Sequence, residues 1–290
     1  MHRHVNFVLS TPQYCPYLAV SLYTLRKHWT GNVVIHAWPE SYGFCERLAR
    51  DPRLYCHVRL AEPKFVGRNA QFLQKIELAI ASKEGTFLYL DSDIVVADSL
   101  LPLFDAAAHY GFIATQFGDW TTQTQVPHWT NTKITTVAGR LDRLRAFPAI
   151  DQRLVEEAIA ESYPSVNGGV FAADWGVIPL QVWLEWTQAA ITTRIPDELV
   201  LHLLQIRFPE LIRVMPGRYN RSPVYHKHIE DYAICHFHGN SAVRSEKGSA
   251  GARKWKALFL HCLEENLGGM MDWYDQCGNK HLNYMMGVAA

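Results

Sequence analysis

The sequence predicts an α/β fold in which a central sheet is flanked by helices. Strand-like and helix-like segments alternate through the first half of the chain, the pattern that such sheets produce. The strand-like segment that begins at Phe87 ends in two aspartates, at the sheet edge where open α/β folds bind ligands. With 290 residues, the chain is long enough for one large domain or two small ones, whose core needs no disulfide or metal staple.

The charge balance of the chain excludes one class of partner. Lys plus Arg and Asp plus Glu number 28 each, so the formal net charge is zero. A nucleic-acid-binding protein normally carries a basic patch or an excess of positive charge, and neither is evident here. An anionic ligand must therefore be held by local groups.

Cysteine spacing and hydropathy favour a soluble, cytoplasmic protein. The six cysteines form no C-x-x-C pair and have no zinc-ligand spacing, which fits reduced thiols, and we expect no disulfide. The N-terminus lacks the apolar stretch of a signal peptide, and no run of about 18 uninterrupted apolar residues occurs. We expect no transmembrane segment; peripheral membrane contact stays open.

The first half of the chain begins with a strand over Asn6–Ser10. A helix follows near Pro16, a residue that favours helix starts, with Leu18, Leu22 and Leu25 on one face. The other elements predicted in this half are a strand over Asn32–Trp38, a helix over Ser41–Arg50, a strand over Leu54–Leu60, a helix over Gln71–Ser82 and a strand ending at Asp91.

The second half is less regular and more aromatic. We expect strands over Gly111–Gln116, Val166–Asp174, Leu211–Met215 and Tyr232–Phe237, and helices over Arg140–Phe147, Asp151–Ser162, Gly176–Thr192, Pro196–Ile206 and Arg253–Leu263. Phe117–Ile134, rich in Thr, Gln and Trp, is predicted to be a loop. Its Trp120 and Trp129 either belong to the core or contact an acceptor. The simplest division is one domain over residues 1–248 and a helical C-terminal extension over 249–290.

Asp91 and Asp93 stand one residue apart where a short, strongly apolar strand ends. Side chains at i and i+2 of an extended chain point to the same side, so both carboxylates can reach one divalent cation. Desolvating two like charges is costly unless a cation or hydrogen-bond donors neutralise them. An Asp-Ser turn that caps the next element is the alternative. We interpret the pair as a metal site that binds the diphosphate of a nucleotide.

Other polar residues have both a structural and a functional interpretation. His236 and His238 share one face of a strand, and their spacing does not decide which of them is a metal ligand. Asn167 precedes two glycines, which either form a turn with positive φ or let a sugar approach the backbone. Asp197 and Glu198 either complement the dipole of a helix or contact a sugar.

Taken in order, several short motifs resemble those of glycosyltransferase family 8, which includes glycogenin and bacterial lipopolysaccharide galactosyltransferases. The matches cover roughly Asn6 to Gly239 and comprise Thr11-Pro12-Gln13-Tyr14, Lys75, Leu90-Asp91-Ser92-Asp93, Asp98 with Leu100–Phe104, Asn167-Gly168-Gly169-Val170, Asp197-Glu198 and His236-Phe237-His238-Gly239. The resemblance implies a GT-A fold, with a mixed central sheet flanked by helices.

The resemblance also implies roles for several of the matched residues. It implies that the metal ligands are Asp91, Asp93 and His236, and this mixed oxygen and nitrogen set suits Mn2+, with Mg2+ as the alternative. It implies catalytic roles for Asn167, Asp197 and Glu198. The donor-binding residues that we expect are Thr11, Tyr14, Arg68, Lys75, Asp91, Ser92, Gly168, Gly169, Gly239 and Arg244.

The chain departs from the family pattern at three positions. The family has a phosphate-binding lysine three residues after the glycine of its H-x-x-G motif, and here that position is Ala242. Arg244 or Lys247 in the following segment can replace it. Glu198 stands where the family has glutamine, and Leu199 stands at the family's second aspartate.

The sequence therefore predicts a metal-dependent hexosyltransferase. The resemblance implies a UDP-linked donor, a hydroxyl acceptor such as a glycan, and retention of the anomeric configuration. A haloacid-dehalogenase-like phosphatase carries its D-x-D at the first strand, whereas three predicted strands precede it here. A sugar-phosphate nucleotidyltransferase would have a glycine-rich basic loop after its first strand. A non-catalytic sugar-nucleotide-binding relative stays open.

Overall fold

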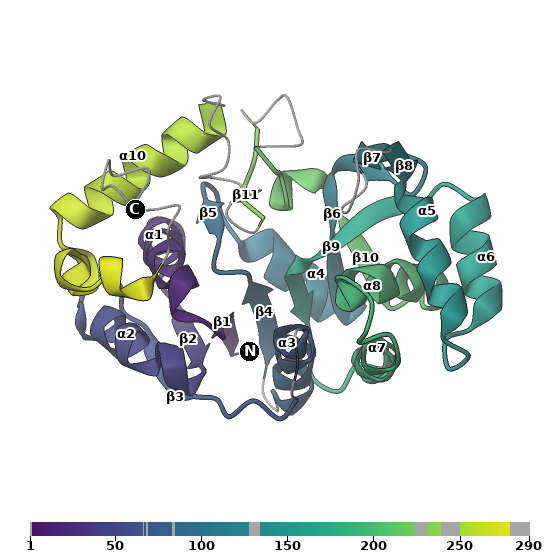
Figure 1. Ribbon diagram of the computed structural model, residues 1–290, viewed down its shortest axis with the longest axis horizontal. Coiled ribbons are helices and arrows are strands. Elements are labelled where there is room, and N and C mark those ends of the chain that lie inside the picture. Colours follow the sequence, from purple (N-terminus) through teal and green to yellow (C-terminus); the bar gives the residue numbers. More distant parts are fainter. Residues whose placement is uncertain are drawn as a thin grey trace. The chain divides into compact units, whose positions relative to one another are not determined.

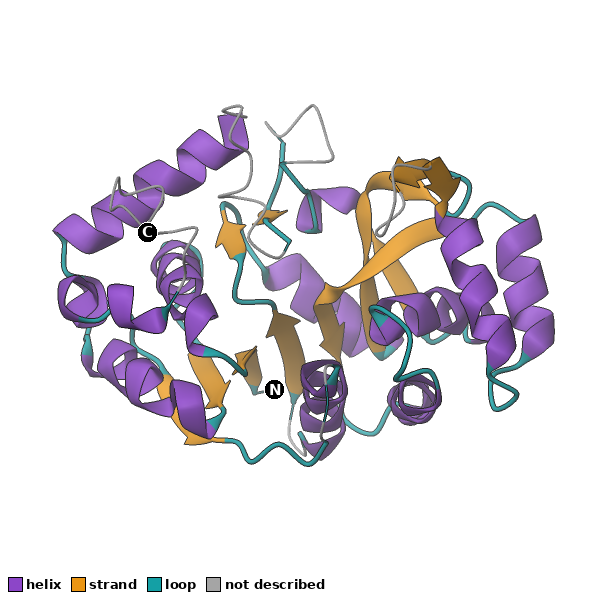
Figure 2. Cartoon of the chain, viewed as in Figure 1, coloured by secondary structure: helices purple, strands orange, loops and turns teal. Residues whose placement is uncertain are grey.

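In the described residues, seven strands form a mixed sheet flanked by helices, and four more pair into two small two-stranded sheets (Figures 1 and 2). The computed structural model describes residues 2–65, 67, 69–82, 85–127, 134–223, 231–238 and 250–278. Contacts divide the chain into two compact units, each built from several segments. Unit 1 comprises Met1–His2, Lys64–Leu88 and Pro102–Gly217, and unit 2 comprises Arg3–Pro63, Tyr89–Leu101 and Arg218–Ala290.

Unit 2 contains a parallel three-stranded part of the sheet in the order β1-β2-β3. Its elements are β1 (Arg3–Leu9), a 3-10 turn (Pro12–Tyr14), α1 (Cys15–Arg26), β2 (Asn32–Ala37), α2 (Pro39–Arg50), β3 (His57–Leu60), β5 (Ile94–Val96), β11 (Ile234–His236), α10 (Ala250–Glu264) and the 3-10 helices Leu267–Asp272 and Asp275–Cys277. Leu18, Leu22 and Leu25 of α1 are fully buried, as their helical spacing predicts.

The described part of the predicted C-terminal extension packs within unit 2. Trp255 of α10 is fully buried and its ring lies 4.8 Å from that of Tyr17 on α1. Trp273 is also fully buried, and its indole N–H donates to the carbonyl oxygen of Gly268 at 2.7 Å. This part of the extension therefore contributes to the core of the unit. The predicted domain boundary between residues 248 and 249 stays a prediction.

Unit 1 contains the strand order β10-β6-β9-β4. Its elements are α3 (Ala70–Ala81), β4 (Thr86–Leu90), α4 (Leu101–Tyr110), β6 (Phe112–Thr121), β7 (Gln125–Pro127), β8 (Ile134–Thr136), α5 (Val137–Leu141), a 3-10 helix (Asp142–Ala146), α6 (Gln152–Ala160), β9 (Pro164–Ala173), α7 (Ile178–Ala189), α8 (Pro196–Arg207) and β10 (Ile212–Met215). The last residues of β4 belong to unit 2. β6 pairs in parallel with β10 and antiparallel with β9, so the sheet is mixed, as expected.

An aromatic cluster forms the centre of the unit 1 core. The ring of Trp183 on α7 lies 4.9 Å from that of Phe171 and 5.7 Å from that of Phe112, in both cases edge to face. All three side chains are fully buried. Edge-to-face pairs of this kind add to the free energy gained by burial.

The structure differs from the elements expected from the sequence in several places, and the short strand β5 (Ile94–Val96) was not predicted. The segment predicted as a loop over 117–134 continues β6 to Thr121 and then forms β7. The helix predicted over Arg140–Phe147 is instead the end of α5 followed by a 3-10 helix. The helix α4 was not predicted, although Ser99 before it and Pro102 in its first turn are typical of a helix start; the Ser99 hydroxyl accepts a hydrogen bond from the Leu101 N–H at 3.2 Å. Residues 128–133, which include His128 and Trp129, lie outside the described residues.

All six cysteines are buried free thiols. Burial raises the pKa of the Cys235 thiol to about 12, which disfavours its reactive thiolate form. In the described parts of the chain, no helix has both the length and the apolar character needed to cross a bilayer.

Candidate functional site

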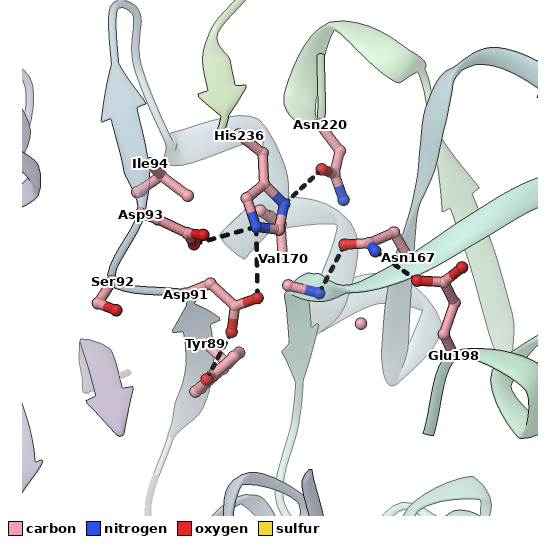
Figure 3. Close-up of polar contacts among 12 residues, drawn as sticks. Tyr89, Asp91, Ser92, Asp93, Ile94, Asn167, Val170, Glu198, Asn220 and His236 are labelled. Carbon is pink, nitrogen blue, oxygen red and sulfur yellow. Dashed lines mark hydrogen bonds and ion pairs between the residues drawn. The ribbon is translucent and has the colours of Figure 1, made fainter. Parts of the chain in front are cut away.

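Asp91, Asp93 and His236 come together in unit 2, where the sequence predicted a metal site. The Nε2 atom of His236 lies 3.2 Å from a carboxylate oxygen of Asp93 and 3.4 Å from one of Asp91 (Figure 3). His236 and Asp93 are buried, whereas the Asp91 side chain is 32% exposed. One donor atom from each residue lies within 4.8 Å of the others. The group is thus enclosed by protein but still accessible through Asp91.

The pairing of β5 with β11 determines this arrangement. The two short strands are antiparallel, with His236 opposite Ile94, and the backbone N–H of Phe237 donates to the carbonyl oxygen of Asp93 at 2.8 Å. This pairing brings residues that are more than 140 positions apart in sequence to the same place.

Two hydroxyls of α1 hold the acidic segment from the other side. The Ser21 hydroxyl accepts a hydrogen bond from the Ile94 N–H at 3.2 Å and lies 2.6 Å from the carbonyl oxygen of Ser92. The Thr24 hydroxyl accepts from the Val96 N–H at 3.2 Å. These hydroxyls supply hydrogen-bond partners for buried backbone groups on both sides of Asp93. They therefore help to hold the segment that carries the two carboxylates in place.

Two further side chains orient the candidate ligands (Figure 3). The hydroxyl of buried Tyr89 donates to Asp91 at 2.7 Å. The Nδ1 atom of His236 lies 3.0 Å from the amide oxygen of Asn220, which is fully buried. An amide oxygen can only accept, so Nδ1 carries a proton and donates it. Neither Tyr89 nor Asn220 was identified from the sequence.

The charges of the group are strongly coupled. Burial alone lowers the pKa of His236, but the neighbouring carboxylates of Asp93 and Asp91 outweigh it and raise the pKa to about 9. A proton and a metal cation would compete for the same lone pair on Nε2 of His236. The two carboxylates and the imidazole therefore form a site that favours positive charge.

The residues fit a divalent metal ion. Two ligands of one small divalent ion, at about 2.1 Å from it and at right angles, lie about 3 Å apart, close to the two observed separations. Oxygen donors with one imidazole suit Mn2+ or Mg2+. The second nitrogen of the histidine is hydrogen-bonded, as it almost always is in metal-ligating histidines.

Of the two candidate histidines, the structure brings His236 and not His238 to the carboxylates. His238 stacks against it, with ring centroids 3.7 Å apart, and has a positive φ of 32°. The strand ends at His236, so the alternation expected of His236 and His238 on one strand does not continue. The positive φ at His238 could not be predicted from the spacing of the two histidines.

A second group of predicted residues forms a buried cluster in unit 1. The Lys75 ammonium on α3 is 2.6 Å from a carboxylate oxygen of Asp197 and donates to the carbonyl oxygen of Gly168 at 2.7 Å. Lys75 and Asp197 are 2% and 3% exposed, so the pair is desolvated. Removing either partner would leave a buried charge uncompensated.

Neither glycine after Asn167 has a positive φ, and at Gly168 the requirement is space. A β-carbon at Gly168 would lie 2.8 Å from Asp197 Oδ2 and 2.9 Å from Lys75 Nζ. Here the pairing of β9 with β6 also shifts: Ala114 is opposite Phe171, and Thr115 is opposite Asn167. Gly168 thus lets the ion pair pack against an irregular stretch of strand.

Asn167 connects this stretch to Glu198 in the first turn of α8 (Figure 3). Its amide oxygen accepts from the Gly169 N–H at 2.9 Å, so its NH2 group faces Glu198 and donates to Oε2 at 2.7 Å. Burial, followed by the nearby charge of Asp197, raises the pKa of Glu198 to about 7, despite the opposing influence of Arg140, Asn167 and Lys75. Glu198 therefore titrates near neutrality.

His202, one turn along α8, anchors this helix to β9. Its Nε2 accepts a hydrogen bond from the Val166 N–H at 3.2 Å, so its Nδ1 donates to the carbonyl oxygen of Glu198 at 2.7 Å. Burial lowers the pKa of His202 to about 4, so it is neutral at physiological pH. The sequence did not identify this residue, although its position one turn after Glu198 was a usable signal.

The remaining predicted donor-binding residues are only partly described. Thr11 precedes the 3-10 turn between β1 and α1, and Tyr14 is the last residue of that turn; Thr11 is exposed and Tyr14 partly buried. Ser92 is buried. Arg68, Gly239 and Arg244 lie outside the described residues, as do Ala242 and Lys247.

The fold resembles that of solved glycosyltransferases. The galactosyltransferase LgtC, solved with donor and acceptor sugar analogs, matches at a TM-score of 0.59 and 16% identity, over 89% of this chain and 95% of its own. Mouse xyloside xylosyltransferase 1 matches at 0.56 and 13%, over 83% and 99% of the two chains. The bifunctional glycosyltransferase WbbM matches at 0.56 and 10%, over 89% and 49%. No protein-family model and no curated protein matches the sequence significantly. The chain thus has the GT-A fold.

Proposed function

We propose that the protein is a metal-dependent glycosyltransferase that moves a hexose from a nucleoside diphosphate sugar to a hydroxyl acceptor. The observation that carries the proposal is the convergence of Asp91, Asp93 and His236 after β4 in a GT-A fold. Two carboxylates and an imidazole provide the ligands for a divalent cation, with Mn2+ preferred and Mg2+ as the alternative. When bound, such a cation supplies Lewis-acid stabilisation of the charge that develops on a leaving diphosphate.

The side chains of the chain itself have the following proposed roles. Thr11 and Tyr14 bind the nucleotide, which we take to be UDP from the family resemblance. Asn167 and Glu198 face the donor sugar, joined by their hydrogen bond of 2.7 Å. Lys75 holds Asp197 and the Gly168 carbonyl in position, a role that differs from the direct phosphate contact expected from sequence. Retention of configuration is part of the same proposal and rests on the resemblance.

A binding protein without transferase activity is the second candidate. Its support is that the metal triad and the Asn167–Glu198 pair are both compatible with holding a sugar nucleotide. The two candidates differ in whether UDP is released from a UDP-sugar.

The proposed metal site is tested by substituting Asp93 with alanine and measuring UDP binding by calorimetry with Mn2+ and with EDTA. We expect the Mn2+-dependent part of the binding to be lost, with the fold intact, because the change removes both a ligand and a repelling carboxylate. Asp98→Ala is the matched control: Asp98 follows the same strand region, but its carboxylate pairs with Arg218 at 2.8 Å. Equal Mn2+ dependence in Asp93→Ala and wild type would rule out the assignment.

A further inference from the structure

We infer that Asn220 is a positioning residue that holds His236 in the tautomer able to bind a metal ion. The inference rests on the proposed metal site and goes beyond it by assigning a residue that matches no motif. Neutral imidazole carries one proton, and only the nitrogen without a proton can donate a lone pair to a cation. Which nitrogen is free therefore decides whether the site can function.

The geometry around His236 makes this choice depend on one amide. Nε2 faces the carboxylates of Asp91 and Asp93, and Nδ1 faces the Asn220 oxygen at 3.0 Å. With this orientation Nδ1–H donates to the amide, so only the proton on Nε2 has to leave when a cation binds between Nε2 and the acidic pair. If the amide were reversed, its NH2 group would donate to Nδ1, the proton would sit on Nε2, and the imidazole could not bind a cation there.

The main chain fixes the position of Asn220 relative to His236. The next residue, Arg221, forms a bridge with Cys235; its N–H donates to the Ile234 oxygen at 3.0 Å, and its carbonyl oxygen accepts from the His236 N–H at 2.8 Å. The segment of Asn220 thus runs alongside β11, and both side chains are buried, at 0% and 2% exposure. These backbone hydrogen bonds fix the main chain from which the Asn220 amide reaches Nδ1 of His236.

The test compares Asn220→Leu, Asn220→Asp and wild type by titration with Mn2+ alone. Leucine has a similar volume but no acceptor, so we expect the dissociation constant to rise about 10- to 100-fold, the usual effect of losing an outer partner of a ligating histidine. Aspartate retains an acceptor oxygen, and we expect affinity within about threefold of wild type or tighter. Should Asn220→Leu fail to fold, Asn220→Ala replaces it.

A buried Asn–His pair elsewhere in unit 2 provides a matched control. The amide oxygen of Asn6 lies 3.1 Å from Nε2 of His36, and the two residues are 2% and 7% exposed. Asn6→Leu removes the same kind of contact outside the metal site, so it should lower the melting temperature and leave Mn2+ affinity unchanged. A purely structural role for Asn220 would make the two leucine variants behave alike.

A second readout follows the proton directly. In protein labelled with 15N-histidine and loaded with diamagnetic Mg2+, we expect His236 to show a protonated Nδ1 and an unprotonated Nε2 in wild type and Asn220→Asp. The inference is overturned if Asn220→Leu binds Mn2+ as tightly as wild type, or if Asn220→Asp loses as much affinity as Asn220→Leu. If wild type binds neither cation, the proposed function itself fails, which is a distinguishable result.

Discussion

Asp197 and Glu198 are adjacent acidic residues with different surroundings. Asp197 is buried and ion-paired with Lys75, which compensates its charge. Glu198 accepts one hydrogen bond, from Asn167, and its pKa is raised to about 7, chiefly by burial. We therefore assign Asp197 to holding the local structure and Glu198 to contact with the donor sugar.

Replacing Glu198 with glutamine should raise stability and lower activity. A carboxyl whose folded-state pKa lies above its unfolded value of about 4.5 is stabilising only while protonated, so stability falls as pH rises from 4.5 to 7. Glutamine cannot ionise, so the variant does not lose this stability. We expect its free energy of unfolding to exceed that of wild type by about 1 to 3 kcal/mol at pH 8 and to differ little at pH 4.

Melting curves at the two pH values and the pH profile of turnover check this prediction. If ionised Glu198 is the working form, wild-type turnover should rise with pH around 7, and this rise should vanish in Glu198→Gln. A variant with normal turnover and an unchanged melting temperature at pH 8 would show that Glu198 neither acts on the donor sugar nor lowers stability when it ionises.

Gly168→Ala should destabilise the protein. The added β-carbon would meet the Asp197 carboxylate at 2.8 Å and the Lys75 ammonium at 2.9 Å, and overpacking of this kind costs about 1 to 3 kcal/mol. Gly43→Ala in α2 is the control, because no atom lies within 4 Å of its β-carbon position. That change should be neutral or stabilising by about 0.5 to 1 kcal/mol. Similar denaturant midpoints for both variants would show that Gly168 is not constrained by the ion pair.

At the scale of elements, α10 supports both parts of the proposed donor site in unit 2. The ring of Trp255 contacts Tyr17, which in turn lies 5.8 Å from Tyr14 of the nucleotide turn. The Trp255 ring also lies 6.4 Å from Phe237, the residue after His236. One side chain of this helix thus reaches the segments that carry the nucleotide turn and a candidate metal ligand.

Trp255→Leu should therefore weaken UDP binding as well as stability. Trp273→Leu is its control, because Trp273 is equally buried but packs on Phe44 of α2, with ring centroids 5.6 Å apart. We expect both variants to lose roughly 2 kcal/mol of stability. Calorimetry with UDP and Mn2+ should show weaker binding only for Trp255→Leu. Equal affinities at equal stability would limit α10 to a structural role.

Elements with strong local signals were predictable from the sequence. The helix face of Leu18, Leu22 and Leu25 and the apolar strand before Asp91 depend on neighbouring residues alone, and both are confirmed. The extension of β6 to Thr121 was not predictable, because its Thr- and Gln-rich sequence resembles a loop and its pairing with β9 is long-range.

The residues of the candidate site likewise divide into those that could be predicted from the sequence and those that could not. The metal triad was predicted because a carboxylate pair at a strand end and a nearby histidine have a recognisable pattern, which the resemblance extended. Asn220 and Tyr89 have no such pattern, since their role depends on hydrogen bonds to ligands that the fold brings near. The Lys75–Asp197 ion pair was missed because helix α3 and the first turn of α8 meet only in the folded chain.

For the whole molecule, the fold is established by structural similarity and the activity is a proposal. The GT-A likeness extends over 89% of the chain, but at 16% identity it establishes the fold alone. The proposed activity rests on two groups, each described within its own unit: a metal triad in unit 2, and in unit 1 an acidic cluster whose Glu198 has a pKa raised to about 7. Metal dependence and sugar transfer are therefore the claims to measure.

The most direct measurement is UDP release from a panel of UDP-hexoses by the wild-type protein, with Mn2+ and with EDTA. We expect turnover of at least one donor with Mn2+, its loss in EDTA, and its loss in Asp93→Ala but not in Asp98→Ala. Binding of UDP-sugars without any release of UDP would favour the non-catalytic candidate. Release that continues unchanged in EDTA and in Asp93→Ala would contradict the central claim.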